Sequence, residues 1–421
     1  MMFVLDRVLR GIFTKGALTI IAPSGRRYRF GDGQGKPIVA RLRDNHTVMR
    51  LMVDPRVALG EAYMDEGLTF EEGTIYDFLD LATANLGWAN ATNWFQTIYY
   101  DYLRPALRRL EQYNPIGRSK SNVAHHYDLS DALYDRFLDS DRQYSCAYFA
   151  EPDDSIETAQ ARKKRHIAAK LLLKPGQRIL DIGCGWGGLG LYLSSIAQGD
   201  LTGVTLSENQ HAVASRRAMI AGVSDRVHFL LRDYRLVESK FDRIVSVGMF
   251  EHVGINHYGE FFRKVADLLT EDGVAMIHFI GRADGPGATN PWISKYIFPG
   301  GYSPALSEVM PHIERAGLYA TDIEVLRLHY AETLKAWRTR FMAQVDEIAK
   351  IYDRRFCRMW EFYLAGSEVT FRHSGHVVFQ IQLARRQDAV PLTRDYITEF
   401  EARHPLAPVV AEPRGLVDAA E

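Results

Sequence analysis

The sequence predicts an α/β protein in which a doubly wound, mostly parallel sheet follows a smaller N-terminal α+β domain. Strand-like apolar runs alternate with helical patterns between residues 159 and 279, which is typical of such a sheet. The apolar run at 178–182 leads directly into a glycine-rich turn and then into a helix. The stretch 115–121 has the Pro, Gly and Ser content of a linker. We therefore expect one domain over residues 1–115 and a second over 122–421.

The N-terminal domain shows a hairpin signal and several helical patterns. Apolar residues alternate with charged ones at the start of the chain, which predicts an amphipathic helix that packs on its domain or rests on a lipid surface. Two short apolar runs on either side of Pro23-Ser24-Gly25 predict the hairpin. The expected strands are 18–21 and 27–30, and the expected helices are 1–13, 74–86 and 94–113.

In the second domain each expected strand is separated from the next by a helix or a turn, as in a right-handed parallel sheet. The expected strands are 178–182, 201–205, 227–231, 241–247 and 274–279, and the expected helices are 159–173, 189–196, 209–221 and 258–268. The segment 282–318 breaks this alternation with Gly, Pro and aromatic residues. We expect it to be an insertion over the ligand crevice, which in such sheets lies beyond the carboxyl ends of the strands.

Composition excludes several classes of function. The 421 residues carry a formal net charge of −1, which argues against a nucleic-acid partner. Three cysteines are too few for a disulfide framework and favour a reducing cytoplasm. No apolar run approaches the roughly 20 residues of a membrane span. The histidines show no recognised metal-ligand spacing, so we expect no metal.

The glycine turn is the strongest local signal for a ligand. Gly183, Gly185 and Gly188 fit the dinucleotide fingerprint, but the next strand ends in Thr205 rather than in the acidic residue that a dinucleotide ribose requires. Asp181, at the end of the first strand, suits a cationic ligand such as S-adenosylmethionine (SAM). A turn without ligand is the third interpretation, although three glycines are costly for turning alone.

Several motifs resemble, in order, those of the cyclopropane-fatty-acyl-phospholipid synthase family, to which the mycolic acid cyclopropane synthases are related. The resemblance covers roughly residues 120 to 390 and implies the class I SAM-dependent methyltransferase fold. The motifs are His126-Tyr-Asp-Leu-Ser130, Tyr144-Ser-Cys-Ala-Tyr-Phe149, Leu180-Asp-Ile-Gly-Cys-Gly-Trp-Gly187, Gly203-Val-Thr-Leu-Ser-Glu-Asn-Gln210, Phe250-Glu-His-Val-Gly254, Ile297-Phe-Pro-Gly-Gly301 and His329-Tyr-Ala-Glu-Thr-Leu334, with Trp337.

The resemblance places a SAM site at the carboxyl edge of the sheet. The glycine turn would hold the methionine part of SAM, Thr205 and Gln210 would face the ribose, and the end of the third strand would border the adenine. Tyr127 and the segment around Ser145 would cover the cofactor. The expected SAM-binding residues are Tyr127, Ser145, Asp181, Gly183, Cys184, Gly185, Thr205, Leu206, Gln210, Arg232 and Asp233.

In this family an alkene attacks the sulfonium methyl group, and a bound bicarbonate is thought to remove the proton that lets the ring close. Such an oxyanion needs hydrogen-bond donors. The residues that match the family's site are Cys146, Glu251, His278, Ile280 and Tyr330. Taken singly, each side chain also has an ordinary structural interpretation: a small apolar residue for Cys146, a helix cap for Glu251, a core histidine for His278 and packing for Tyr330.

The expected substrate is a phospholipid with an unsaturated acyl chain, reached from the inner face of the membrane by a cytoplasmic, peripherally bound protein. Arg104, Arg108 and Arg109 recur on one helical face, and residues 162–165 form a second basic cluster; each cluster either attracts anionic lipid or is a solvated surface. A homodimer would add avidity. The alternatives are a methyltransferase that forms methylene- or methyl-branched chains from the same carbocation, an NAD-type oxidoreductase, and a lipid-binding protein without catalysis.

Overall fold

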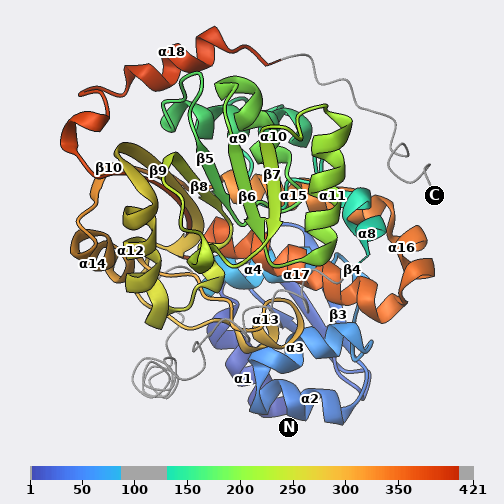
Figure 1. Cartoon of the computed structure of the whole chain (residues 1–421). Helices are drawn as coiled ribbons and strands as arrows, with labels where there is room; N and C mark the ends of the chain where they lie inside the picture. The colour runs from blue at the N-terminus through green and yellow to red at the C-terminus, as the bar shows by residue number, and fades with distance from the viewer. Residues whose placement is uncertain (1, 87–129, 407–421) are drawn as a thin grey trace. The chain divides into compact units, whose positions relative to one another are not determined.

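The computed structural model describes residues 2–86 and 130–406 (Figure 1). The described chain forms two compact units. The first contains residues 2–86 together with Ala288–Pro299 and Leu334–Gly375, and the second contains 130–287, Gly300–Thr333 and 376–406. The expected helix 94–113, the linker 115–121, the arginines 104, 108 and 109, and Tyr127 lie outside the described residues.

The first unit is built on a sheet whose strand order is β2-β1-β3-β4 within the described residues. The expected hairpin is confirmed, since Leu18 of β1 pairs with Phe30 of β2 in antiparallel register. The strands are β1 (Ala17–Ile21), β2 (Arg27–Phe30), β3 (Pro37–Leu42) and β4 (Leu68–Glu72), and the helices are α1 (Met2–Ile12), α2 (Asn45–Val53), α3 (Pro55–Met64), α4 (Ile75–Leu86), α13 (Pro291–Tyr296), α16 (Val345–Ile351) and α17 (Arg354–His373).

The core of the first unit joins its early and late segments. Leu18, Ile38 and Phe78 are buried in one cluster with Ala365 and Val369 of α17. The helix α17 packs along both α3 and α4. Along the sequence, the chain therefore returns to the first unit after most of the residues of the second unit.

The second unit contains the predicted α/β sheet, and its fold class is confirmed. In the described residues seven strands lie in the order β10-β11-β9-β8-β5-β6-β7. Strands β9, β8, β5, β6 and β7 run parallel, whereas β11 is antiparallel to both β9 and β10. The strands are β5 (Ile179–Ile182), β6 (Leu201–Thr205), β7 (Val227–Leu231), β8 (Phe241–Val247), β9 (Leu269–Arg282), β10 (Tyr319–Leu326) and β11 (His376–Ala384).

Helices cover both faces of this sheet because successive side chains of a strand point to opposite sides. Ile179 belongs to the cluster formed with α9, α10, α11 and α18, whereas Leu180 and Ile182 belong to the cluster formed with α12 and α14. The helices are α8 (Asp131–Phe137), α9 (Ile156–Lys170), α10 (Gly188–Ala197), α11 (Glu208–Ile220), α12 (Tyr258–Leu268), α14 (Leu306–Arg315) and α18 (Asp395–Arg403), and α15 (His329–Ala343) begins in this unit.

The segment 282–318 is divided between the two units. Residues Ala288–Pro299, with α13, belong to the first unit. From Gly300 the chain belongs to the second unit, where α14 packs on α12 and leads into β10 (Figure 1). The alternation of helix and strand therefore resumes at Leu306.

Candidate SAM and acyl-chain site

The glycine turn joins β5 to α10 with backbone angles that glycine adopts readily. Gly183, Gly185 and Gly187 have φ values of +83°, +53° and +84°. A Cβ on Gly187 would lie 2.8 Å from the ring of Phe229, so packing also requires glycine there. A Cβ on Gly185 would meet nothing within 4 Å. The turn is thus closed toward the protein at Gly187 and open at Gly185, where a ligand can approach the backbone.

Asp181 is a buried carboxylate at the end of β5. Its Oδ2 has no hydrogen-bond partner among the described residues. Burial raises the pKa of Asp181 to about 7, and the charge of Lys163 acts in the opposite direction. An unpaired buried carboxylate beside an open glycine turn fits a ligand that brings a cationic amine, because such a ligand offsets the cost of burying the charge.

Lys163 is a buried residue beside the predicted site residue Ser145, and the sequence did not predict its position. The predicted basic surface at 162–165 is wrong at this position, since Lys163 is fully buried. Its Nζ donates to Gln143 Oε1 at 2.7 Å and to Ser145 Oγ at 2.8 Å. Burial lowers the pKa of Lys163 to about 8. Its flanking residue Lys164 is also engaged, by an ion pair with Asp141 at 2.5 Å.

The ends of β6 and β7 carry the next group of predicted SAM residues. Thr205 Oγ1 donates to Gln210 Oε1 at 2.9 Å, and both side chains are buried. Leu206 follows β6 and is half-buried. Beyond β7, Arg232 is exposed, whereas Asp233 is buried and ion-pairs with Arg235 at 2.7 Å.

Asp233 also accepts a hydrogen bond from the Arg235 backbone N–H at 3.0 Å, which caps a short 3-10 helix. Its carboxylate thus has a structural role in addition to any contact with a nucleobase. Cys184 in the glycine turn is buried, and its backbone N–H donates to Val204 O at 3.0 Å.

The segment from Ser145 to Ala147 connects the cofactor side of the site to the start of α15. Ser145 accepts from Lys163, and Ala147 N donates to Thr333 Oγ1 at 3.0 Å. Cys146 between them is buried, and burial raises the pKa of its thiol, so this thiol is neutral. A Cβ on Gly248 would lie 3.9 Å from the Ser145 Cβ, so this segment also lies beside the end of β8.

Glu251 and Ile280 are brought together at the ends of β8 and β9. Glu251 lies on the short 3-10 helix Phe250–His252 that follows β8, and its Oε1 accepts from the Ile280 backbone N–H at 2.6 Å. Its Oε2 has no partner among the described residues. Burial raises the pKa of Glu251 to about 7, against the effect of the Ile280 hydrogen bond. The carboxyl group can therefore hold or release a proton near neutral pH.

His278 is buried on β9, and Tyr330 is buried in the first turn of α15. The His278 backbone O accepts from Gly248 N at 2.9 Å, and its ring Nδ1 lies 3.2 Å from Gln380 Nε2. Burial, followed by the positive charges of Lys163 and Lys170, holds the pKa of His278 well below its usual range. The imidazole is therefore neutral and can donate only one ring proton.

The structure places Asp181, Thr205, Arg232 and Glu251 at the ends of neighbouring parallel strands. Three contacts join described members of the predicted set that are not chain neighbours: Thr205 with Gln210, Thr205 with Arg232, and Glu251 with Ile280. The edge combines an open glycine turn, a buried carboxylate, a neutral thiol and a neutral imidazole. These groups fit SAM at the β5 end and a small oxyanion near β9. Among residues 2–86 and 130–406, we find no cluster of His, Cys, Asp or Glu that could hold a metal ion. Within the same residues no helix is long and apolar enough to cross a membrane.

The sheet order and the glycine turn define a SAM-dependent methyltransferase, and comparison with solved structures supports this class. A mycolic acid cyclopropane synthase in complex with SAH and CTAB superposes with a TM-score of 0.60 at 31% identity, covering 63% of this chain and 97% of that chain. A cyclopropane synthase from Mycobacterium tuberculosis superposes with a TM-score of 0.61 at 32% identity, covering 65% of this chain and 99% of that chain.

The particular family follows from the sequence. The model of the mycolic acid cyclopropane synthetase family matches residues 116–381, and the chain belongs to this family. The cyclopropane-fatty-acyl-phospholipid synthase of Escherichia coli is 37% identical over 349 residues, which cover 83% of this chain and 88% of the relative. The tuberculostearic acid methyltransferase of Mycobacterium tuberculosis is 33% identical over 401 residues, 90% of each chain. The predicted family is therefore confirmed, and the oxidoreductase alternative is wrong.

Proposed function

We propose that the protein transfers a methylene group from SAM to the cis double bond of an unsaturated phospholipid acyl chain and forms a cyclopropane ring, with bicarbonate as proton acceptor. The observation that carries the proposal is the buried edge where Glu251 contacts Ile280 beside neutral His278. The cyclopropane-forming relative in E. coli supports the choice of substrate.

In this mechanism the alkene π electrons form a bond to the sulfonium methyl carbon while the carbon–sulfur bond breaks toward sulfur. The resulting carbocation loses a proton from the transferred methyl group, and the released electron pair closes the ring. Bicarbonate, when bound, would supply the acceptor for that proton. The chain's own residues bind and orient: His278 and Tyr330 donate hydrogen bonds, and the unpartnered Oε2 of ionised Glu251 would accept the hydroxyl proton of bicarbonate.

The buried surroundings serve the same chemistry. Cys146, His278 and Glu251 are shielded from water, which would otherwise capture the cation. Asp181 is placed at the end of β5, where its charge would attract the amino group of SAM. Asp181 lies on β5, His278 on β9 and Glu251 on a short 3-10 helix, whereas Cys146 lies in the irregular segment that precedes α9.

The test is to incubate the purified protein with SAM and vesicles of unsaturated phospholipid and to record the proton NMR spectrum of the product. Cyclopropane methylene protons resonate far upfield, whereas a methylene-branched chain of the same mass has vinyl signals. Turnover should fall in buffer freed of carbon dioxide and recover when bicarbonate is added. Full turnover without bicarbonate would exclude it as the acceptor.

Two variants test the residue assignments. His278→Ala and Tyr330→Phe should each lower kcat by about 10²-fold, since each removes a donor near the reacting atoms, while SAM affinity is retained. Tyr319→Phe is the matched control, because Tyr319 is an exposed tyrosine of β10 in the same unit. Unchanged kcat in both site variants would reject the oxyanion site.

A second candidate is a methyltransferase that forms methylene- or methyl-branched chains. The tuberculostearic acid methyltransferase, which matches along 90% of this chain, favours it. Both candidates share the carbocation and differ in which proton leaves, and a methyl-branched product also requires a reductant. The same NMR spectrum separates them.

We further propose that the first unit docks the protein on the inner face of the membrane. Phe3, Val4 and Val8 of α1 are 78%, 49% and 49% exposed, and Val53 at the end of α2 is 79% exposed. Each such side chain would gain roughly 1.5–3 kcal/mol on full burial in lipid. Phe3→Ser should weaken sedimentation with anionic vesicles, while Leu392→Ser, an exposed leucine of the second unit, should not. Equal binding of both variants would reject docking through α1.

The expected homodimer and the cytoplasmic location belong to the same proposal. Two docking surfaces in a dimer would bind one vesicle with greater avidity. Sedimentation equilibrium of the full chain tests the dimer directly, and a single species of 47.9 kDa would reject it.

A further inference from the structure

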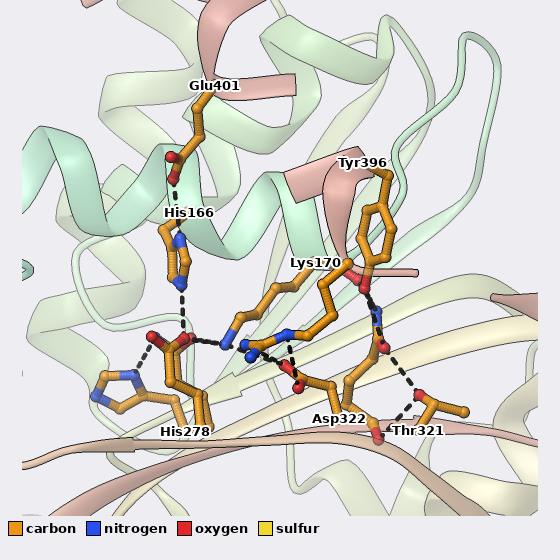
Figure 2. A network of polar contacts seen from close by, with 11 residues as sticks. His166, Lys170, His278, Thr321, Asp322, Tyr396 and Glu401 are labelled. Carbon is orange, nitrogen blue, oxygen red and sulfur yellow. Dashed lines mark hydrogen bonds and ion pairs between the residues drawn. The ribbon is translucent and has the colours of Figure 1, made fainter. Parts of the chain in front are cut away.

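The ring of His278 is connected to a buried polar network that extends to the outer helix α18 (Figure 2). Gln380, on the neighbouring strand β11, faces His278 across the β9–β11 pair, where the two residues are direct register partners. Gln380 is fully buried. Because solvent cannot supply alternative partners, the orientation of this amide is set by protein groups alone.

The orientation of the Gln380 amide is determined by Lys170. Lys170 of α9 is also fully buried, and its Nζ donates to Gln380 Oε1 at 2.9 Å. An ammonium group only donates hydrogen bonds, so it must face the amide oxygen. The amide nitrogen is then directed to His278 Nδ1, at 3.2 Å.

Further residues hold the side chain of Lys170 in place. Its Nζ forms an ion pair with Glu324 of β10 and lies 3.5 Å from Asp322 Oδ2. Glu324 also accepts from His166 Nε2 at 2.7 Å, and His166 Nδ1 contacts Glu401 of α18 at 2.8 Å (Figure 2). A reversed Gln380 amide would place its NH₂ group against this ammonium.

We propose that Lys170 and Gln380 are positioning residues that fix His278 as the Nε2–H tautomer. An amide nitrogen has no lone pair to accept with, so Nδ1 of His278 must be unprotonated and the ring proton must lie on Nε2. Among the described residues Nε2 has no hydrogen-bond partner. Its N–H is therefore left to donate to a ligand.

This tautomer has a consequence for catalysis that rests on the proposed function. A neutral Nε2–H can hold bicarbonate by a hydrogen bond without giving up its proton. An imidazolium would hand a proton to the oxyanion and remove its basicity. The hydrogen bonds from Lys170 to Gln380 and from Gln380 to His278 would thus keep the bound bicarbonate basic.

The test is the protonation state of the His278 ring in full-length protein labelled with ¹⁵N-histidine, saturated with SAH, without lipid or bicarbonate. Long-range ¹H–¹⁵N correlation should show a pyridine-like Nδ1 and a pyrrole-like Nε2, assigned by the signal that His278→Asn removes. In Gln380→Glu the new carboxylate accepts instead of donating, so Nδ1 should become protonated. In Gln380→Leu the ring should populate both tautomers.

Gln382→Glu is the matched control. Gln382 is buried on the same strand two residues further on, but its Nε2 donates to Lys170 O at 2.5 Å and to Tyr396 at 2.9 Å rather than to His278. This variant should keep the wild-type ring signal. The inference would be overturned if the wild-type His278 ring were protonated on Nδ1. It would also be overturned if the His278 ring ¹⁵N signals were unchanged in both Gln380 variants.

A kinetic measurement on the same variants separates this inference from the proposed function. Gln380→Glu should raise the bicarbonate concentration for half-maximal turnover by at least about tenfold, since the donor to the anion is lost. If the wild type needs no bicarbonate while the ring signals change as expected, the proposed acceptor fails and the tautomer assignment stands. If bicarbonate is required but Gln380→Glu leaves both the ring and the half-saturation unchanged, the positioning role fails.

Discussion

Replacing Asp181 by Asn should stabilise the ligand-free protein at alkaline pH while weakening its affinity for SAM. Burial raises the pKa of Asp181 from 3.8 to about 7, so the folded state favours the protonated carboxyl. Stability from this group is present at low pH and is lost as the pH rises through about 7. Between pH 5 and pH 8 the loss amounts to about 2.5 kcal/mol.

The assay is urea denaturation of wild type and Asp181→Asn at pH 5 and pH 8, without SAM or SAH. The difference in unfolding free energy between the two proteins should grow by about 2.5 kcal/mol from pH 5 to pH 8. Because the asparagine amide does not titrate, its effect on the unfolding free energy is the same at both pH values and cancels in this comparison. Asp200→Asn, an exposed aspartate of the second unit, controls for the substitution. If the difference in unfolding free energy between wild type and Asp181→Asn is the same at pH 5 and pH 8, the raised pKa of Asp181 is refuted.

Binding completes the test, because the charge that destabilises the free protein is the charge expected to attract the ligand. Isothermal titration at pH 8 should give Asp181→Asn an SAH affinity at least about tenfold below that of the wild type, from loss of a charge-assisted hydrogen bond. Equal affinity would remove Asp181 from the cofactor site.

Three further predictions concern the turn, the acid and the first unit. Gly185→Val should abolish SAH binding measured by titration, since the added side chain would occupy open ligand space, whereas Gly222→Val, at a similar φ of +66° with nothing nearby, should bind normally. Turnover that depends on ionised Glu251 should rise as the pH passes through about 7, and this step should vanish from the pH–rate profile of Glu251→Gln. Gly60→Ala would place a Cβ 2.4 Å from Trp292 Nε1 and should lower the unfolding free energy by about 1–3 kcal/mol in urea denaturation; an unchanged midpoint would show that Trp292 can move aside.

The sequence was most informative where local periodicity and local packing agree. The predicted strands 201–205, 227–231 and 241–247 coincide with β6, β7 and β8, because each is a short apolar run bounded by polar turns. The sequence also predicted the glycine turn, since glycine adopts positive φ values more readily than any other residue.

The antiparallel edge of the sheet was not predicted. Strands β10 and β11 pair with each other, but the segment Leu334–Gly375 of the first unit lies between them in sequence. Pairing across so long a separation leaves no signal in a local window. Family resemblance supplied the proposed catalytic residues, whose individual patterns were compatible with ordinary structural roles.

Lys163 shows why periodicity did not predict the buried lysines of α9. On α9 the buried face includes Gln160, Lys163 and Lys170, three polar residues at spacings that normally hold apolar ones. A run of four basic residues therefore looked like a surface cluster. Only the partners Gln143 and Gln380, which lie on other elements, reveal that the lysines point inward.

The late position of β11 has a consequence for synthesis on the ribosome. His278 and Gln380 are 102 residues apart, so at about 5–20 residues per second the nascent chain carries β9 without its neighbour for about 5–20 s. During that interval the backbone N–H and C=O groups of one side of β9 are unpaired and open to pairing with another chain. Newly made protein should therefore depend on a chaperone that shields this edge until translation has passed residue 384.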